Sequence, residues 1–132
     1  MNQEDKDLLL RDLCSRLPYM VKVGTSDNDG SLENVWDTLW YNTFTEDVKL
    51  THSIEDADKI VDISEIKPYL FPLSSMTDEQ SKIYHELIGG MFGTGVLVNL
   101  EILIDWLNKN HFDYRGLIPK GLAIDATWLN IY

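Results

Sequence analysis

The stretch Leu17-Pro18-Tyr19-Met20-Val21-Lys22-Val23 divides the chain into a helical beginning and a β-rich middle. Before it, residues 3–17 show the i, i+3, i+4, i+7 spacing of an amphipathic helix, at Leu10, Leu13, Cys14 and Leu17. Pro18 ends such a helix, and residues 19–23 are short and β-prone. A chain that begins helical and continues with short strands is typical of the α+β class.

The middle of the chain predicts short strands joined by polar turns. The candidate strands are residues 19–23, 32–44, 48–52 and 59–63, with a bulge or second turn near Asp37 and Thr38. Parallel neighbours need long crossover connections, whereas the links here are short. The pattern therefore predicts a small antiparallel meander.

Two helices and a docked tail are expected in the second half. Pro68 and Pro72 indicate a connector over residues 64–75 without a long regular element. Thr77 and Gln80 have the spacing of a capping box, which predicts a helix over residues 78–88 that ends at two glycines. A further helix is predicted over residues 98–109, and the apolar tail beyond it should pack on the domain. Residues 1–132 thus form a single α+β domain.

Size and charge limit the classes of partner. A folded chain of 132 residues buries about 68% of its unfolded surface, which supports a core without metals or disulfides. The net charge is −11, and residues 1–66 contribute −9 of it from 15 acids and 6 bases. Such a charge repels phosphate groups, so we expect no direct nucleic-acid binding and no association with anionic membranes. A basic protein partner is compatible with it.

The location expected from these features is the cytoplasm. The acidic start does not have the positive region of a signal peptide, and no apolar run is long enough to span a bilayer. Cys14 is the single cysteine, so no internal disulfide forms. Its place on the apolar stripe predicts a packed thiol rather than a nucleophile.

Several motifs resemble parts of ligand-binding sites. Asp27, Asp29 and Gly30 match part of a calcium loop, but its twelfth ligand would be Trp36, so a hairpin turn is expected instead. The glycine-rich residues 89–95 lack the Gly-Lys-Ser/Thr ending of a phosphate loop. The three histidines have no metal-ligand spacing. We therefore expect neither a metal nor a cofactor.

The densest polar chemistry lies in residues 111–115. His111, Asp113, Tyr114 and Arg115 could build an acid–base site. The alternative is structural: Arg115 holds the turn through Asp113 or nearby carbonyls, while aromatic side chains pack. We expect the structural role, with Trp106, Phe112 and Tyr114 tying the last helix to the tail.

Two blocks of the sequence carry a resemblance. Residues 62–79, DISEIKPYLFPLSSMTDE, and residues 105–126, DWLNKNHFDYRGLIPKGLAIDA, resemble shared blocks of a family of small uncharacterised acidic proteins of gut bacteria and their phages and mobile elements. Phe71 and Leu73 differ from the Arg and Met expected there, which argues against a charged role at position 71. The family has no established activity, so the resemblance implies an architecture and an accessory role but no site residue.

The function expected from these observations is that of a small cytosolic, non-enzymatic interaction protein of mobile-element or phage origin, with a protein partner. Two alternatives stay open. The first is an acidic decoy that mimics nucleic acid and binds a basic protein. The second is an enzyme that uses residues 111–115, with His111 facing a cavity.

Overall fold

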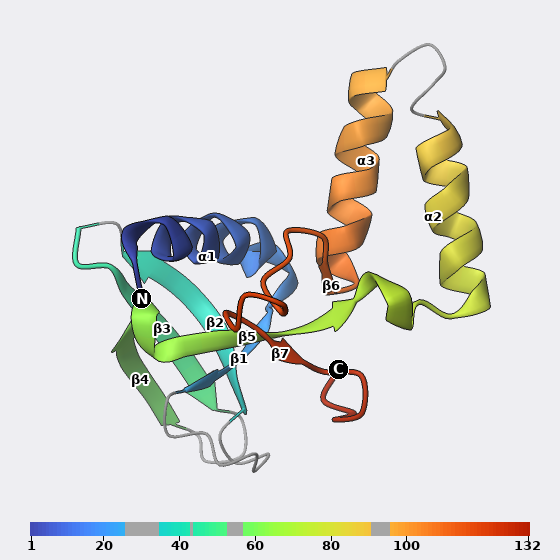
Figure 1. The fold of residues 1–132 in the computed structure, drawn as a ribbon. Helices are drawn as coiled ribbons and strands as arrows, with labels where there is room; N and C mark the ends of the chain where they lie inside the picture. Colours follow the sequence, from blue (N-terminus) through green and yellow to red (C-terminus); the bar gives the residue numbers. More distant parts are fainter. Residues whose placement is uncertain (26–34, 43, 53–56, 91–95) are drawn as a thin grey trace.

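The structure is a computed structural model that describes residues 1–25, 35–42, 44–52, 57–90 and 96–132 (Figure 1). Its helices are α1 (Gln3–Arg16), α2 (Asp78–Gly90) and α3 (Val96–Lys109). Its strands are β1 (Lys22–Thr25), β2 (Val35–Asn42), β3 (Asp47–His52), β4 (Ala57–Asp62), β5 (Ile66–Pro72), β6 (Phe112–Asp113) and β7 (Ile124–Asp125). Short 3₁₀ turns are η1 (Leu17–Tyr19), η3 (Ile63–Glu65) and η4 (Leu73–Ser75). The α+β class is confirmed.

Helix α1 begins and ends where the sequence indicates. Asn2 caps it, because its side-chain oxygen accepts a hydrogen bond from the Asp5 amide at 2.7 Å. Glu4 and Asp5 lie in the first turn, where carboxylates interact favourably with the helix dipole. After Arg16 the chain tightens into η1, which contains Pro18.

The buried face of α1 differs from the expected stripe. Its buried residues are Leu9, Asp12, Leu13 and Arg16, and Cys14 is exposed. The expectation of a packed Cys14 was therefore wrong. Asp12 and Arg16 pair with each other, and this pairing allows both charged side chains to be buried on the inner face of α1. The apolar pattern alone predicts a different inner face, one that includes Cys14. Partial desolvation still raises the pKa of the Cys14 thiol, which disfavours the reactive thiolate.

The sheet is mixed rather than a pure meander. Strands β4, β3, β2, β1 and β5 follow one another in space as antiparallel neighbours, and β5 then pairs in parallel with β6 and with β7. The register between β2 and β3 shifts between Thr38 and Trp40, close to the bulge expected near Thr38. The meander was thus right for four strands, and the parallel additions from the tail were missed.

Strand β5 is the main error in the expected elements. Residues 66–72 form a strand that includes both Pro68 and Pro72. At Pro68, β5 has a strand neighbour on the β1 side, opposite Val23, while β7 and β6 pair only from Tyr69 onward. Proline has no N–H to donate, so a strand tolerates it where no neighbouring strand lies on that side of the backbone. The segment is therefore a central strand and not a connector.

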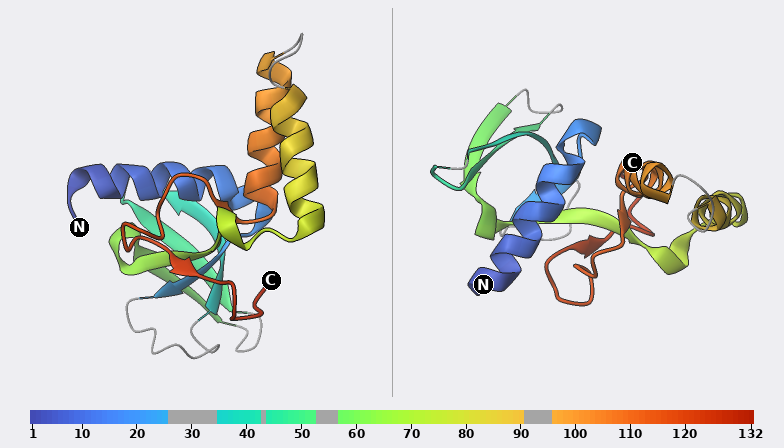
Figure 2. Two further views of the ribbon diagram at one scale, coloured as in Figure 1. Left: turned by 45° about the vertical axis from the view of Figure 1, so that its right-hand side comes forward. Right: turned by 90° about the horizontal axis from the view of Figure 1, so that it is seen from above.

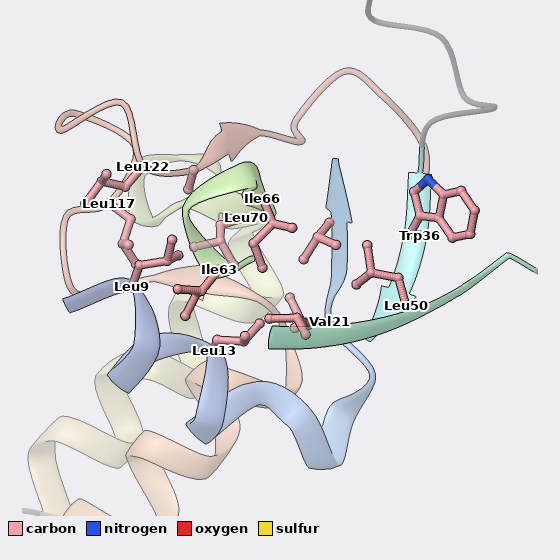
Figure 3. Packing of buried hydrophobic residues seen from close by; sticks show 13 residues of the cluster. Leu9, Leu13, Val21, Trp36, Leu50, Ile63, Ile66, Leu70, Leu117 and Leu122 are labelled. Carbon is pink, nitrogen blue, oxygen red and sulfur yellow. The ribbon is translucent and has the colours of Figure 1, made fainter. Parts of the chain in front are cut away.

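The main core lies between α1 and the inner face of the sheet (Figure 3). Leu9 and Leu13 of α1 form one hydrophobic cluster with residues of β1, β2, β3, β5, η3 and the tail. The fully buried members include Leu9, Leu13, Val21, Val23, Val48, Leu50, Ile63, Ile66, Leu70 and Leu117. Leu117 belongs to the tail, so the expectation that the tail docks is confirmed.

Helices α2 and α3 stand side by side as a hairpin that projects from the sheet (Figure 2). The capping box is present: the Thr77 amide donates to Gln80 Oε1 at 3.0 Å, and the Gln80 amide donates to Thr77 Oγ1 at 3.1 Å. A second core cluster at the base contains Leu103, Leu107 and Phe112. In the part of the chain that the structure describes, no helix has the length and apolar content to cross a bilayer.

Candidate functional site

Residues 111–115 follow the end of α3 and include β6, and they lie close to the C-terminal end of α1. His111 has φ of +60°, a left-handed conformation that turns the chain directly after the helix. Its carbonyl accepts a hydrogen bond from the Phe71 amide at 2.8 Å, and Phe112 then pairs with Phe71 in the parallel β5–β6 ladder. The segment is thereby fixed to the centre of the domain.

Asp113 holds the turn that follows it. The sequence predicts this role for Asp113 and Arg115 together. The two carboxylate oxygens of Asp113 accept hydrogen bonds from the Leu117 amide at 2.9 Å and the Ile118 amide at 2.8 Å. The side chain is buried, and its charge is compensated by these backbone donors. Asp113 is therefore occupied as a structural cap.

Arg115 reaches α1 instead of Asp113, which corrects the expected pairing. Its Nη1 donates to Asp12 Oδ1 at 3.0 Å and to Ser15 Oγ at 2.9 Å. The sequence could not indicate this contact, because the two partners are about a hundred residues apart along the chain. Arg115 thus ties the tail to α1 rather than closing its own turn.

Asp12 is the centre of a buried ionic cluster. Arg16 donates to it twice, from Nε to Oδ2 at 2.8 Å and from Nη2 to Oδ1 at 3.0 Å, and both side chains are fully buried. Arg16 Nη2 also donates to the Phe112 carbonyl at 2.6 Å. This bidentate geometry with a further acceptor offsets part of the desolvation cost of the buried ion pair, while Arg16 Nη1 is buried without a hydrogen-bond partner among the described residues. We call Asp12, Arg16 and Arg115, with Tyr114, the buried cluster.

Tyr114 completes the buried cluster. Its ring lies 4.6 Å from the Arg115 guanidinium and 5.3 Å from that of Arg16, which are cation–π distances. Its hydroxyl donates to Asn108 Oδ1 of α3 at 2.8 Å. Phe112 is buried in the second core cluster, and Trp106 and Tyr114 pack against that core cluster. The expectation that these three aromatic residues tie α3 to the tail is confirmed.

His111 is half-buried and stacks on the last residue of the chain. The rings of His111 and Tyr132 are 3.7 Å apart between centroids and nearly parallel. Burial, with the positive charges of Arg16 and Lys22, lowers the pKa of His111 to about 4. Its buried Nδ1 has no hydrogen-bond partner among the described residues. At neutral pH the imidazole is therefore uncharged and a weak base.

Tyr132 is held through its hydroxyl. The hydroxyl donates to the Tyr69 carbonyl at 2.8 Å and accepts from the Lys22 amide at 2.9 Å. Burial raises the pKa of this phenol, so it stays protonated. With His111 uncharged and Tyr132 fully bonded, the pair has no group poised to exchange a proton near neutral pH.

The other two histidines lie apart from this region. His52 is buried with its ring 4.9 Å from that of Trp36, and His85 on α2 is exposed with Nδ1 2.7 Å from the Ser81 carbonyl. Among the residues that the structure describes, no three His, Cys, Asp or Glu side chains gather as a metal site would require. Residues 27–30 of the calcium-like motif and residues 91–95 of the glycine-rich motif lie outside the described residues.

A small pocket of about 220 Å³ opens beside Phe112. It is lined by Phe71, Ser75, Thr77, Gln80, Phe112 and Thr127. Thr77 and Gln80 are engaged in the capping box, and the Ser75 hydroxyl donates to the Pro72 carbonyl at 2.7 Å. His111 and Arg115 do not line it. The pocket therefore does not join the polar residues of the segment into an acid–base site.

A different surface was missed by the sequence analysis. On the face of the sheet opposite α1, Trp40, Lys49 and Ile60 lie side by side on β2, β3 and β4. Trp40 is 39% and Ile60 58% exposed. Asp58 and Asp62 flank Ile60 along β4 on the same face. We call these five residues the outer edge; residues 58–62, Asp-Lys-Ile-Val-Asp, show no polar–apolar alternation that could have indicated it.

Comparison of the chain with known protein families, curated proteins and solved structures gave no match.

Proposed function

We propose that this chain is a small, non-enzymatic interaction protein that binds a partner protein through its outer edge. The observation that carries the proposal is the exposure of Trp40 and Ile60 on neighbouring strands, beside Lys49. A large aromatic and a branched aliphatic side chain on a rigid sheet provide the anchors that protein interfaces favour. The cytoplasm is the proposed location, and the family resemblance supports an accessory role.

The enzyme alternative has less support at residues 111–115. Asp113 and Arg115 bond to backbone amides and to α1, and Tyr114 bonds to Asn108. A general base should have a pKa near the working pH, whereas that of His111 is lowered to about 4. These bonds support a structural role for residues 111–115 rather than a catalytic one.

The acidic decoy is the second candidate, and one observation favours it. Asp47 and Asp62 lie directly opposite each other on β3 and β4, although like charges in that position destabilise a sheet. Hydrogen bonds from Ser64 and the charge of Lys6 stabilise the Asp62 carboxylate and lower its pKa, and a cationic ligand would add to this compensation. If the chain is a decoy, double-stranded DNA should compete with it for the captured partner.

Capture with a matched pair of variants tests the proposal. Immobilised wild-type chain, Trp40→Ser and Trp128→Ser are exposed to the same cell extract, and the retained proteins are measured by quantitative mass spectrometry. Trp128 is 92% exposed in the tail, so it controls for the loss of any exposed tryptophan. The proposal expects a protein lost with Trp40→Ser and kept with Trp128→Ser. Equal retention by all three would refute it.

A further inference from the structure

Strand β4 is the last strand of the sheet, at the side away from the helical hairpin (Figure 1). Within the described residues it pairs with β3 alone. An edge of this kind presents unpaired amide and carbonyl groups that can bind another strand.

The phase of the β3–β4 ladder shows which groups face outward. The Ile63 amide donates to the Glu46 carbonyl at 3.1 Å. Hydrogen-bonded and non-hydrogen-bonded pairs alternate along an antiparallel ladder, so Val48–Val61 and Leu50–Lys59 are the bonded pairs. The backbone groups of Asp58, Ile60 and Asp62 therefore point to the open edge.

The side chains of the same three residues lie on the outer face. Val61 packs against the core, and Lys59 lies with its ammonium 4.8 Å from the centre of the Trp36 ring. Because successive side chains alternate, Asp58, Ile60 and Asp62 take the opposite face. An added strand would meet an acid, an aliphatic residue and an acid at every second position.

The charges around this edge remain negative after the ion pairs are counted. Lys49 pairs with Asp58 at 3.7 Å, and Lys6 pairs with Glu46. The one basic residue of β4, Lys59, lies on the other face. Asp47 and Asp62 lie opposite each other and form no ion pair within 4 Å among the described residues, although Asp62 accepts two hydrogen bonds from Ser64 and is near the charge of Lys6. This excess favours a cationic strand.

A second copy of the chain is a poor occupant of the same edge. Antiparallel pairing of two β4 strands about Ile60 would place Asp58 of each copy opposite Asp62 of the other. Like charges directly opposite destabilise a sheet, and each copy carries a net charge of −11.

We infer that β4 accepts an extended segment of a basic protein as an added antiparallel strand, with Lys or Arg opposite Asp58 and Asp62 and an aliphatic residue opposite Ile60. This rests on the proposed function and names the chemistry of its partner. Backbone hydrogen bonds supply affinity in such strand addition, and the alternate side chains supply specificity.

The probe is the peptide acetyl-Ser-Lys-Thr-Val-Thr-Lys-Ser-amide, titrated into the isotopically labelled protein by NMR. Antiparallel addition opposite Ile60 directs the valine amide toward β4 and the neighbouring threonine amides away from it. N-methylation of the valine should therefore weaken binding about tenfold or more, and N-methylation of the threonine after it by no more than about twofold. Replacing both lysines by glutamate should abolish binding.

Variants of the protein provide the matching test. Ile60→Pro removes the outward amide without touching a β3–β4 hydrogen bond and should weaken peptide binding about tenfold, whereas Ile60→Thr keeps the amide and should weaken it less. The double variant Asp58→Asn with Asp62→Asn keeps oxygen acceptors, including the one that caps η3, and should remove the preference for lysine over glutamine in the peptide. Unfolding curves of each variant verify that it is folded.

Three results would overturn the inference. They are equal weakening by both N-methyl groups, no binding at about 1 mM peptide, and a dimer of the chain that Ile60→Pro dissociates. The capture experiment separates the two proposals. If Trp40→Ser still loses the partner when the peptide fails, strand addition is wrong and the proposed function stands. If Trp40→Ser retains every captured protein, the proposed function is wrong.

Discussion

The buried cluster and the outer edge use the same kinds of side chain in opposite ways. Asp12 receives three hydrogen bonds from two arginines and is fully buried. Asp58 has one long ion pair to Lys49, and its side chain is 52% exposed. Residues 111–115 stand out in the sequence because they carry several polar and titratable side chains. In the structure these side chains are engaged in hydrogen bonds and packing within the fold. The less conspicuous residues Asp58, Ile60 and Asp62 keep their side chains on the outer face and their backbone groups at the open edge.

The difference follows from the cost of burying charge. Burying an ionised group costs free energy unless it is paired and hydrogen-bonded, and Asp12 and Arg16 are buried as such a pair. An exposed charge is solvated already and contributes little to stability. It can therefore be used in recognition without weakening the fold.

The largest expected effect is on the carboxylate of the buried cluster. Asp12→Ala leaves Arg16 buried without its counter-ion and should lower the free energy of unfolding by about 3–5 kcal/mol. The matched change Asp58→Ala should lower it by less than about 0.5 kcal/mol. Urea unfolding followed by tryptophan fluorescence measures both. Similar losses for the two variants would show that the buried cluster and the outer edge are not energetically distinct.

Two tryptophans extend the comparison to aromatic residues. The Trp106 ring is stacked 5.5 Å from Phe112 and 6.4 Å from Tyr84, but it remains partly exposed. Full burial would make Trp106→Ala cost about 3–5 kcal/mol, so its partial exposure reduces our expectation to about 2–3 kcal/mol. Trp40→Ala should cost less, because Trp40 is 39% exposed on the open face. If thermal unfolding shows the larger loss for Trp40, that residue belongs to the core and not to an interface.

The elements were largely predictable because their signals are local. The capping box at Thr77 and the bulge near Thr38 depend on residues a few positions apart, and the structure confirms both. The sequence also showed Asp12 and Arg16 at i,i+4 spacing. What it could not show is that this pair faces the core, since burial depends on Phe112, 96 residues further along.

The non-local features account for the errors. Strand β5 is stabilised by β1 on one side and by the tail on the other, and neither contact is visible around Pro68. The candidate site had the same difficulty. Arg115 is separated from Asp12 by 103 positions, and the outer edge exists because residues 40, 49 and 60 are brought into register by two hairpins.

Arg115 tests how the tail is attached to α1. Arg115→Ala removes its bonds to Asp12 and Ser15 while the bidentate Arg16–Asp12 pair remains, so we expect a loss of about 1–2 kcal/mol. Arg115→Lys keeps the charge but not the forked geometry and should recover only part of that loss. A variant as stable as wild type would mean that β6, β7 and the apolar contacts of the tail are sufficient to dock it.

The smallest expected effect concerns pH and decides whether His111 belongs to a packed joint. Its folded-state pKa of about 4 lies below the ordinary 6.5, because burial and the charges of Arg16 and Lys22 oppose protonation. Between about pH 4 and pH 6.5, the imidazole of His111 is therefore mostly protonated in the unfolded chain and mostly neutral in the folded chain. The stability contributed by neutral His111 is complete above pH 6.5 and is lost as the pH falls toward 4.

His111→Asn isolates this contribution from the titration of the carboxylates. Asparagine tolerates the φ of +60° and does not titrate, so the wild-type minus variant difference in unfolding free energy reports on the imidazole. Because His111 is only half-buried, solvent screening reduces the effect, and we expect the difference to shrink by about 1 kcal/mol between pH 7 and pH 5. A difference that stays constant over this range would mean that His111 titrates as in water, facing solvent. An accessible imidazole beside Tyr132 would restore the acid–base alternative and remove the contrast between a closed cluster and an open edge.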